Sequence, residues 1–158
     1  MRVEYINPFI SSLANAFLTM LGCQVRRGAV SLKDGNSPKY EISGVVGFSG
    51  RAIGTVVLSL SEAVALKATS TMLLCETTSV NADVVDAVGE LTNMVAGGAK
   101  AKLEDYRLAV SLPSVITGRN HEVRFPSNVI PICVPFETAW GPLALEVGFA
   151  PVPAEVAV

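Results

Sequence analysis

The sequence predicts an α+β domain in which a mostly antiparallel sheet of about six strands packs against three helices. Three observations point to this class. Hairpin turns separate the strand-like segments, the helical segments are grouped, and 50% of the residues are hydrophobic. The predicted order is one helix, three strands, two helices and three strands. Because the 158 residues contain no Pro/Gly-rich linker, we expect one domain over residues 1–150 and a loose tail over 151–158.

The first predicted helix covers residues 7–21. Seven apolar residues, beginning with Ile6 just before this range, recur at helical spacing and form a single stripe. Asn7 suits the N-cap, and Pro8 suits the first helical position, where the missing N–H costs nothing. Gly22 suits the C-terminal end.

Six short segments rich in Val and Ile are predicted to be strands: 25–32, 40–48, 51–60, 107–112, 129–136 and 143–149. Turn residues at 34–38 and 49–50 join the first three as hairpins. Pro131 and Pro135 lie four residues apart, so their missing donors fall on the same edge of the fifth segment. We therefore expect this strand at a sheet edge or bulged.

Two further helices are predicted between the third and fourth strands. Ser59 or Ser61 is expected to cap the first of them, which runs to about Leu74, and Ser59 with Glu62 fits a capping box. The second covers 81–102. Its core-facing stripe consists of Val84, Val88, Leu91 and Val95.

The opposite side of the 81–102 helix carries a row of polar and small residues: Asp86, Gly89, Glu90, Asn93, Gly97 and Lys100. Asp86 and Glu90 are like charges at i, i+4, which is mildly destabilising. Each glycine costs up to about 1 kcal/mol relative to Ala in an exposed helix. Small residues beside Glu90 and Asn93, which project together, let a large partner approach closely. We interpret the row as a docking face; the alternative is a solvated face whose glycines serve helix packing.

The run 86–97, with Glu90 and Asn93 at its centre, resembles the signature helix of the CheC/CheX/FliY chemotaxis phosphatases. Further similarity lies at 5–9, 51–60 and 112–118, so that the resemblance covers roughly residues 5–149. With a single Glu-x-x-Asn helix, the chain resembles CheX more than CheC. In CheC-like members a Pro follows the Asn at a longer interval than the nineteen residues between Asn93 and Pro113.

The resemblance implies a cytoplasmic phosphatase that dephosphorylates a phospho-aspartyl, CheY-like response regulator in chemotaxis or related two-component signalling. Asn93 would orient the attacking water, and Glu90 would pair with the active-site Lys of the regulator. The remaining residues of the row would contact the partner: Asp86, Gly89, Gly97 and Lys100. The chain itself would bind no metal or cofactor, since Mg²⁺ belongs to the regulator, and homodimers are common among CheX-like proteins.

Two other functions stay open at this point. The first is a CheX-like module that binds a regulator without hydrolysing its phosphate, and the second is a dimeric sensory or scaffolding domain. Retention of both Glu90 and Asn93 favours catalysis, because a scaffold has no need for the amide.

Composition excludes several other classes. A net charge of −2 with 6% aromatic residues and no basic block argues against nucleic acid. The single histidine, His121, excludes a His-rich metal site and is expected to be a surface or loop residue. No apolar run approaches a membrane span of about 18 residues. Polar residues interrupt the stretch before Cys23 that faintly resembles a lipoprotein signal, so export is not expected.

Two smaller expectations concern Cys and Trp. The three cysteines, Cys23, Cys75 and Cys133, are odd in number and far apart in the sequence. They predict reduced, mostly buried thiols rather than disulfides or a metal knuckle. Trp140, beside Gly141 and Pro142, is expected to anchor a hairpin turn against the core.

Overall fold

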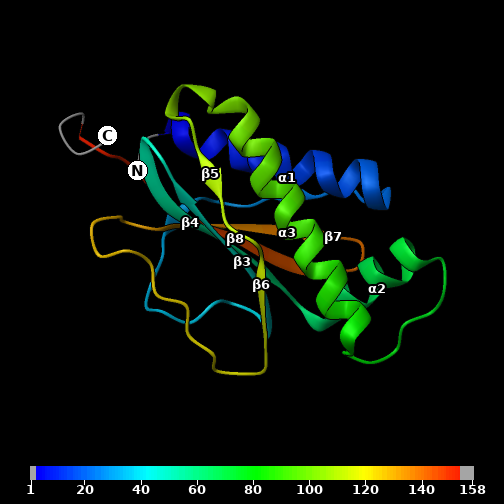
Figure 1. Cartoon of the computed structure of the whole chain (residues 1–158). Helices are drawn as coiled ribbons and strands as arrows, with labels where there is room; N and C mark the ends of the chain where they lie inside the picture. The colour runs from blue at the N-terminus through cyan, green and yellow to red at the C-terminus, as the bar shows by residue number, and fades with distance from the viewer. Residues whose placement is uncertain (1–2, 154–158) are drawn as a thin grey trace.

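The computed structural model describes residues 3–153 and shows one antiparallel sheet with three α-helices on one of its faces (Figure 1). The helices are α1 (Val3–Leu21), α2 (Glu62–Leu73) and α3 (Ala82–Lys102), and a 3₁₀ turn, η1 (Glu104–Tyr106), follows α3. The strands are β1 (Arg26–Arg27), β2 (Ser31–Leu32), β3 (Ile42–Ser49), β4 (Ala52–Leu60), β5 (Ala109–Val110), β6 (Ser114–Thr117), β7 (Ile132–Thr138) and β8 (Gly141–Pro151).

The strand order is β1-β7-β8-β4-β3-β5, with β2 also paired to β7 and β6 also paired to β3. All of these pairs are antiparallel. The predicted α+β class with three helices is therefore confirmed. The described residues contain eight strands rather than about six, because the predicted segment 25–32 forms two short strands, β1 and β2, and because β6 is an additional strand.

The helix face of the sheet is apolar. Alternate residues of the central strands point toward the helices, and Val46, Val56 and Leu145 are fully buried there. Phe9 and Leu13 of α1, also fully buried, pack in the same cluster. Burial of such side chains is the main source of stability for the layer that carries α3.

The opposite face, which we call the loop face, is covered by the long connections 28–41 and 118–131 (Figure 1). A Cβ built on Gly148 of β8 would come within 2.8 Å of Phe125 Cδ2, so the second connection lies directly on the sheet. Glu146 of β8 is only 1% exposed, and one of its oxygens bonds Lys33 Nζ at 2.7 Å. Its other oxygen, Oε1, is buried without a hydrogen-bond partner.

The predicted start of the first helix was wrong. Helix α1 begins at Val3, so Pro8 lies inside it and Asn7 is no N-cap. The apolar stripe of 7–21 continues to Tyr5 and Ile6, whose burial extends the helix beyond the expected start. Proline there removes one backbone donor near the N-terminus, a loss that the packing of the stripe outweighs.

The predicted capping box of α2 is also absent. Ser61 is the N-cap, but its Oγ donates to the Pro142 carbonyl at 2.7 Å instead of capping the helix. The backbone N–H of Glu62 is satisfied by Glu41 Oε1 at 2.7 Å. Ser59 Oγ accepts from Tyr40 N–H at 2.9 Å, so a residue of the connection before β3 occupies the hydroxyl that the box requires.

The segment predicted as one strand over 25–32 is broken into β1 and β2. Gly28 lies at the break, where its N–H donates to the Pro135 carbonyl at 2.7 Å. Pro135 cannot donate in return, so the outer edge of β7 carries two short strands instead of a continuous partner. The strand that was expected at a sheet edge or bulged thus has β1 and β2 outside it, and its pairing on that side is interrupted beside Pro135. The strand expected over 107–112 shrinks to β5.

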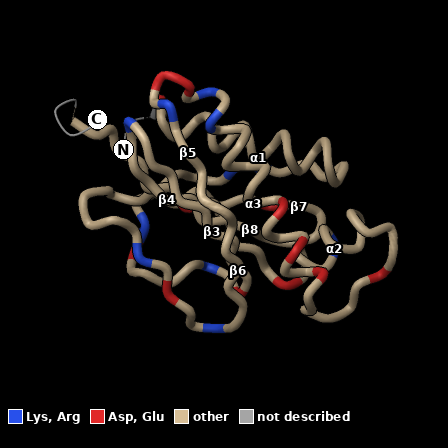
Figure 2. The backbone as a smooth tube through the Cα atoms, viewed as in Figure 1, with Lys and Arg blue, Asp and Glu red and all other residues tan. Residues whose placement is uncertain are grey.

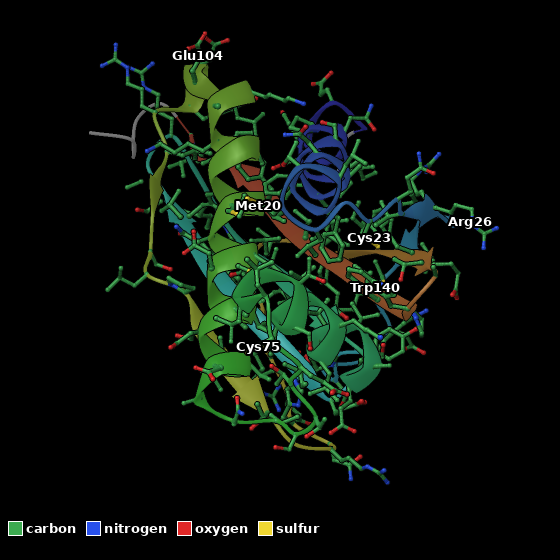
Figure 3. The ribbon with its side chains drawn as sticks, turned by 90° about the vertical axis from the view of Figure 1, so that its right-hand side faces the viewer. Met20, Cys23, Arg26, Cys75, Glu104 and Trp140 are labelled. Atoms are coloured by element: carbon green, nitrogen blue, oxygen red, sulfur yellow. The ribbon has the colours of Figure 1, made fainter. Side chains whose placement is uncertain are left out.

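Several smaller predictions can be placed. Trp140 lies in the β7–β8 turn and packs against the core, as expected. Cys23 and Cys133 are buried free thiols, whereas Cys75 is exposed; Figure 3 shows Cys23 near Trp140 at the end of α1. Strand β8 reaches Pro151, and the rest of the predicted tail from residue 154 lies outside the described residues. None of the helices within residues 3–153 combines the length and apolar character that a membrane crossing needs.

Candidate functional site

Helix α3 has well-defined ends. Asn81 is its N-cap, and its Oδ1 accepts a hydrogen bond from Val84 N at 3.2 Å. At the other end the backbone N–H of Leu103 donates to the Lys100 carbonyl at 3.0 Å. The helix therefore starts and stops where the sequence predicts, and its face is fixed along the whole length.

The side of α3 that faces the sheet is the predicted apolar stripe. Val84, Val88, Leu91 and Val95 are all 0% exposed. Because 3.6 residues make one turn, burial of these four turns the polar row outward.

Two close steric fits hold α3 in place on its flanks. On the sheet side, Thr92 packs against Gly44 of β3, where a Cβ would overlap the Thr92 side chain. Thr92 Oγ1 donates to the Val88 carbonyl at 2.7 Å, so the buried hydroxyl is satisfied. On the α1 side, Gly98 leaves room for Ser12, and Ser12 Oγ donates to the Val95 carbonyl at 2.7 Å. Gly98 thus serves helix packing, which is the alternative interpretation of the glycines.

The outward face carries five of the six predicted site residues. Asp86, Glu90, Asn93, Gly97 and Lys100 are all exposed. A Cβ at Gly97 would have no neighbour within 4 Å, so this glycine is not needed for packing inside the domain. Glu90 and Asn93 lie one turn apart, with about 5–6 Å between Cβ atoms at this spacing.

Gly89 is the exception in the row, because it is buried. A Cβ there would lie 3.6 Å from Val115 Cγ2 and 3.8 Å from Pro113 Cγ. The segment before β6 therefore runs along α3, and Pro113 borders the Glu90–Asn93 face despite the short connection from Asn93. Leu112, beside it, is 89% exposed.

Charge is divided along α3. Asp86 and Glu90 lie in its N-terminal half, whereas Lys100 and Lys102 lie in its last turn (Figure 2). Asp83 in the first turn and the two lysines in the last turn also complement the helix dipole. Within the described residues, neither Glu90 nor Lys100 takes part in an ion pair, so both charges are available to a partner.

A hollow of about 450 Å³ lies at the C-terminal end of this face and is lined by Gly97, Lys100, Ala101, Glu104, Arg107 and Leu108. Sequence reasoning missed Arg107. Its backbone is left-handed, with φ 48° and ψ 52°, and nothing in the sequence indicates this conformation.

His121 lies in a loop, as predicted, and it also has two hydrogen-bond partners. It lies on the loop face, where Nε2 is 2.8 Å from Ser43 Oγ and Nδ1 is 2.7 Å from the Gly118 carbonyl. These contacts arise because the 118–131 connection folds back onto β3. His121 also lines a second hollow of about 760 Å³, together with Lys39, Tyr40 and Arg119.

The Glu90–Asn93 face has the groups for positioning water rather than for covalent catalysis. An amide both donates and accepts, so Asn93 can hold a water in one orientation without changing charge. A carboxylate such as Glu90 suits a cationic partner. Within residues 3–153 no group of three His, Cys, Asp or Glu side chains is placed to hold a metal ion.

Comparison with known proteins shows the family. The family model for "Chemotaxis phosphatase CheX" matches residues 42–137, which is more than half of the chain. This chain belongs to the CheX family. The matched region includes all of α3 and its Glu-x-x-Asn sequence.

Individual relatives and solved structures match a larger part of the chain than the family model does. The Thermotoga maritima "CheY-P phosphatase CheX" is 28% identical over 127 residues, covering 78% of this chain and 82% of the relative. The crystal structure of a CheC-like superfamily protein from Shewanella sp. PV-4 has a TM-score of 0.87 and 36% identity, covering 95% of this chain and 99% of that one. The CheX–CheY–BeF₃–Mg²⁺ complex from Borrelia burgdorferi shares the fold, with a TM-score of 0.76 and 23% identity over 94% of this chain and 98% of that one.

Proposed function

We propose that this protein hydrolyses the aspartyl phosphate of a CheY-like response regulator, with Asn93 and Glu90 as its functional residues. The observation that carries the proposal is the exposure of Glu90 and Asn93 together on the outer face of α3. The Thermotoga maritima relative is a CheY-P phosphatase, and the Borrelia burgdorferi relative was crystallised with CheY and BeF₃. Both names agree with a phosphorylated regulator as the substrate.

The proposed chemistry requires little of this chain. An acyl phosphate is already activated, so hydrolysis needs an in-line water more than a strong base. Asn93 would enter the active site of the regulator and orient that water, as a glutamine does in GTPases. Glu90 would pair with the active-site Lys of the regulator and hold the complex in register, while the Mg²⁺ that neutralises the phosphate is bound by the regulator.

The test is phosphate release from a panel of phosphorylated CheY-like regulators of the source organism. We expect the wild-type protein to accelerate release from at least one of them and Asn93→Ala to abolish the acceleration. The matched control is Asn15→Ala on α1, since Asn15 is an exposed helical asparagine away from this face. Equal rates for Asn93→Ala and the wild type would remove Asn93 from the mechanism.

Binding separates catalysis from mere docking. Glu90→Gln should weaken binding to the BeF₃⁻-loaded regulator, because truncating one member of a buried interfacial charge pair costs about 2–5 kcal/mol. Wild-type protein that binds the loaded regulator without accelerating phosphate release would instead support the non-catalytic binding module. We also propose a homodimer, as is common in CheX-like proteins, which sedimentation equilibrium would test.

A further inference from the structure

We propose that the hollow at the C-terminal end of α3 is a second docking contact, which receives an acidic side chain of the receiver domain. The inference rests on the proposed function and adds to it the orientation of the partner. The hollow, lined by Gly97, Lys100, Arg107 and three neighbours, continues the face that carries Glu90 and Asn93.

The shape of the hollow depends on Gly97. A Cβ at this position would meet nothing within 4 Å, so the space above it is open to solvent. Gly97 lies one turn beyond Asn93 on the same exposed face. A partner that places its phosphorylated residue at Asn93 must also cover Gly97, so the hollow falls inside the contact area.

The cations at the rim favour an acidic occupant. Lys100 and Arg107 are both exposed, and within the described residues neither forms an ion pair. Glu104 is the acidic residue of the lining, and Figure 3 shows its side chain at the tip beyond α3, pointing away from the helix body. An acidic side chain in the hollow could therefore contact both cations, and Arg107 could bind it through two parallel N–H donors.

The backbone conformation of Arg107 is a second, independent reason to place a contact at this hollow. A non-glycine residue in the left-handed region is disfavoured, and such residues concentrate at functional sites. Arg107 is held there by its N–H, which donates to the Glu104 carbonyl at 3.0 Å, and by Arg51 N–H, which donates to the Tyr106 carbonyl at 2.9 Å. Glycine would fit this position better, so the turn itself does not require an arginine side chain. The helix dipole, which accounts for Lys100, does not account for Arg107, because Arg107 lies beyond the helix.

The two ends of the face would then fix one orientation of the partner. Glu90 would contact a cation of the receiver, and the Lys100–Arg107 end would contact an anion. A receiver rotated by half a turn would place like charges together at both ends, which disfavours that arrangement.

The experiment measures affinity for the BeF₃⁻-loaded form of the regulator that the wild type dephosphorylates, at low and at physiological salt. Arg107→Gly and Lys100→Gln should each weaken binding about tenfold at low salt and less at higher salt. Arg107→Gly should leave Tm unchanged or raise it by about 2–4 °C, because glycine relieves the left-handed backbone. Gly97→Leu should fill the hollow and block binding while the helix stays folded.

The control is Arg27→Gln, which removes an exposed cation from β1 at the opposite edge of the sheet. It should bind like the wild type. In a charge-swap series, Arg107→Glu should recover affinity when one exposed acidic residue of the receiver is changed to Lys.

Two results would overturn this inference while leaving the phosphatase proposal intact. The first is wild-type affinity for both Arg107→Gly and Lys100→Gln with a fully active wild type. The second is a lowered Tm for Arg107→Gly, which would show that the arginine is structural. If the wild type neither binds nor dephosphorylates any regulator in the panel, the proposed function fails and this contact fails with it.

Discussion

The two faces of the sheet are covered by different kinds of contact. On the helix face, apolar side chains such as Leu145 and Val56 meet the apolar stripes of the helices, and α3 is located by two glycine fits. On the loop face, the buried carboxylate of Glu146 is matched to Lys33, whose side chain is only 3% exposed. Apolar packing responds little to pH, whereas a buried ion pair depends on the charge of both members. The docking row thus lies on the layer that packs through apolar contacts rather than through a buried ion pair.

Breaking the ion pair should have the largest effect on stability. Lys33→Met leaves Glu146 buried without a cation, and removal of one partner of a buried pair costs about 3–5 kcal/mol. Urea denaturation of the two proteins measures the difference. Arg124→Met, which breaks the exposed pair with Glu122, is the control and should cost less than about 1 kcal/mol. Equal losses of unfolding free energy in the two variants would show that the buried pair stabilises the fold no more than the exposed pair does.

The two adjacent glycines of α3 provide a matched test of the helix face. Gly98→Ala would overlap Ser12, which forms the fit to α1, and overpacking of this kind costs about 1–3 kcal/mol. Gly97→Ala meets open space and should stabilise the helix by up to about 1 kcal/mol. The Tm values of the two variants, measured by thermal unfolding, should therefore shift in opposite directions from that of the wild type. A loss of stability in both would mean that the outer face also packs within the domain.

The pH dependence of stability should be traceable to the loop face. Burial raises the pKa of Glu146 above its ordinary value of 4.5, while Lys33, Lys39 and His121 oppose the rise, and Cys133 faces it from β7. The folded protein therefore holds this proton more tightly than the unfolded chain does. Between 4.5 and the raised pKa, the contribution of Glu146 to stability falls as pH increases, by at most about 1.4 kcal/mol per pH unit.

Glu146→Gln isolates that contribution. Urea midpoints across mildly acidic to neutral pH should fall less steeply with increasing pH in this variant than in the wild type. Parallel curves for the two proteins would contradict the assignment of the slope to Glu146.

The smallest effect on stability is expected at the site itself. Asn93→Ala truncates an exposed side chain opposite the buried stripe, so unfolding free energy should change by no more than about 0.5 kcal/mol. The same variant is expected to lose phosphatase activity. Denaturation and phosphate release measured on one preparation would show this separation. A large loss of stability would place Asn93 in the fold rather than in the mechanism.

The sequence was sufficient for α3 because periodicity and capping act locally. Asn81 caps the helix and the Val84–Val95 stripe is buried, and both follow from spacing along one element. It was insufficient where distant segments compete for the same group. Ser61 Oγ bonds Pro142 rather than its own helix, and the hydroxyl of Ser43 meets His121 from a loop.

The same limit applies to buried charge and to backbone strain. Glu146 interrupts an apolar strand, but only the fold brings Lys33, 113 positions away in the chain, to its oxygen. The left-handed backbone of Arg107 arises where η1 ends, and local sequence offers no glycine or asparagine to signal it. The polar row was predictable, whereas the hollow that extends it was not.

The two fits that hold α3, at Gly44 and at Gly98, have a kinetic consequence. Because α3 is packed tightly on both flanks, it presents the same surface before and after a partner binds. Binding then requires side chains to become ordered, but it does not require the backbone to refold. Association should then be limited by mutual orientation, at about 10⁵–10⁷ M⁻¹ s⁻¹, and quickened by the opposed charges at the two ends of the face. Variants of this surface that leave its charges unchanged should consequently alter the lifetime of the complex more than the rate at which it forms.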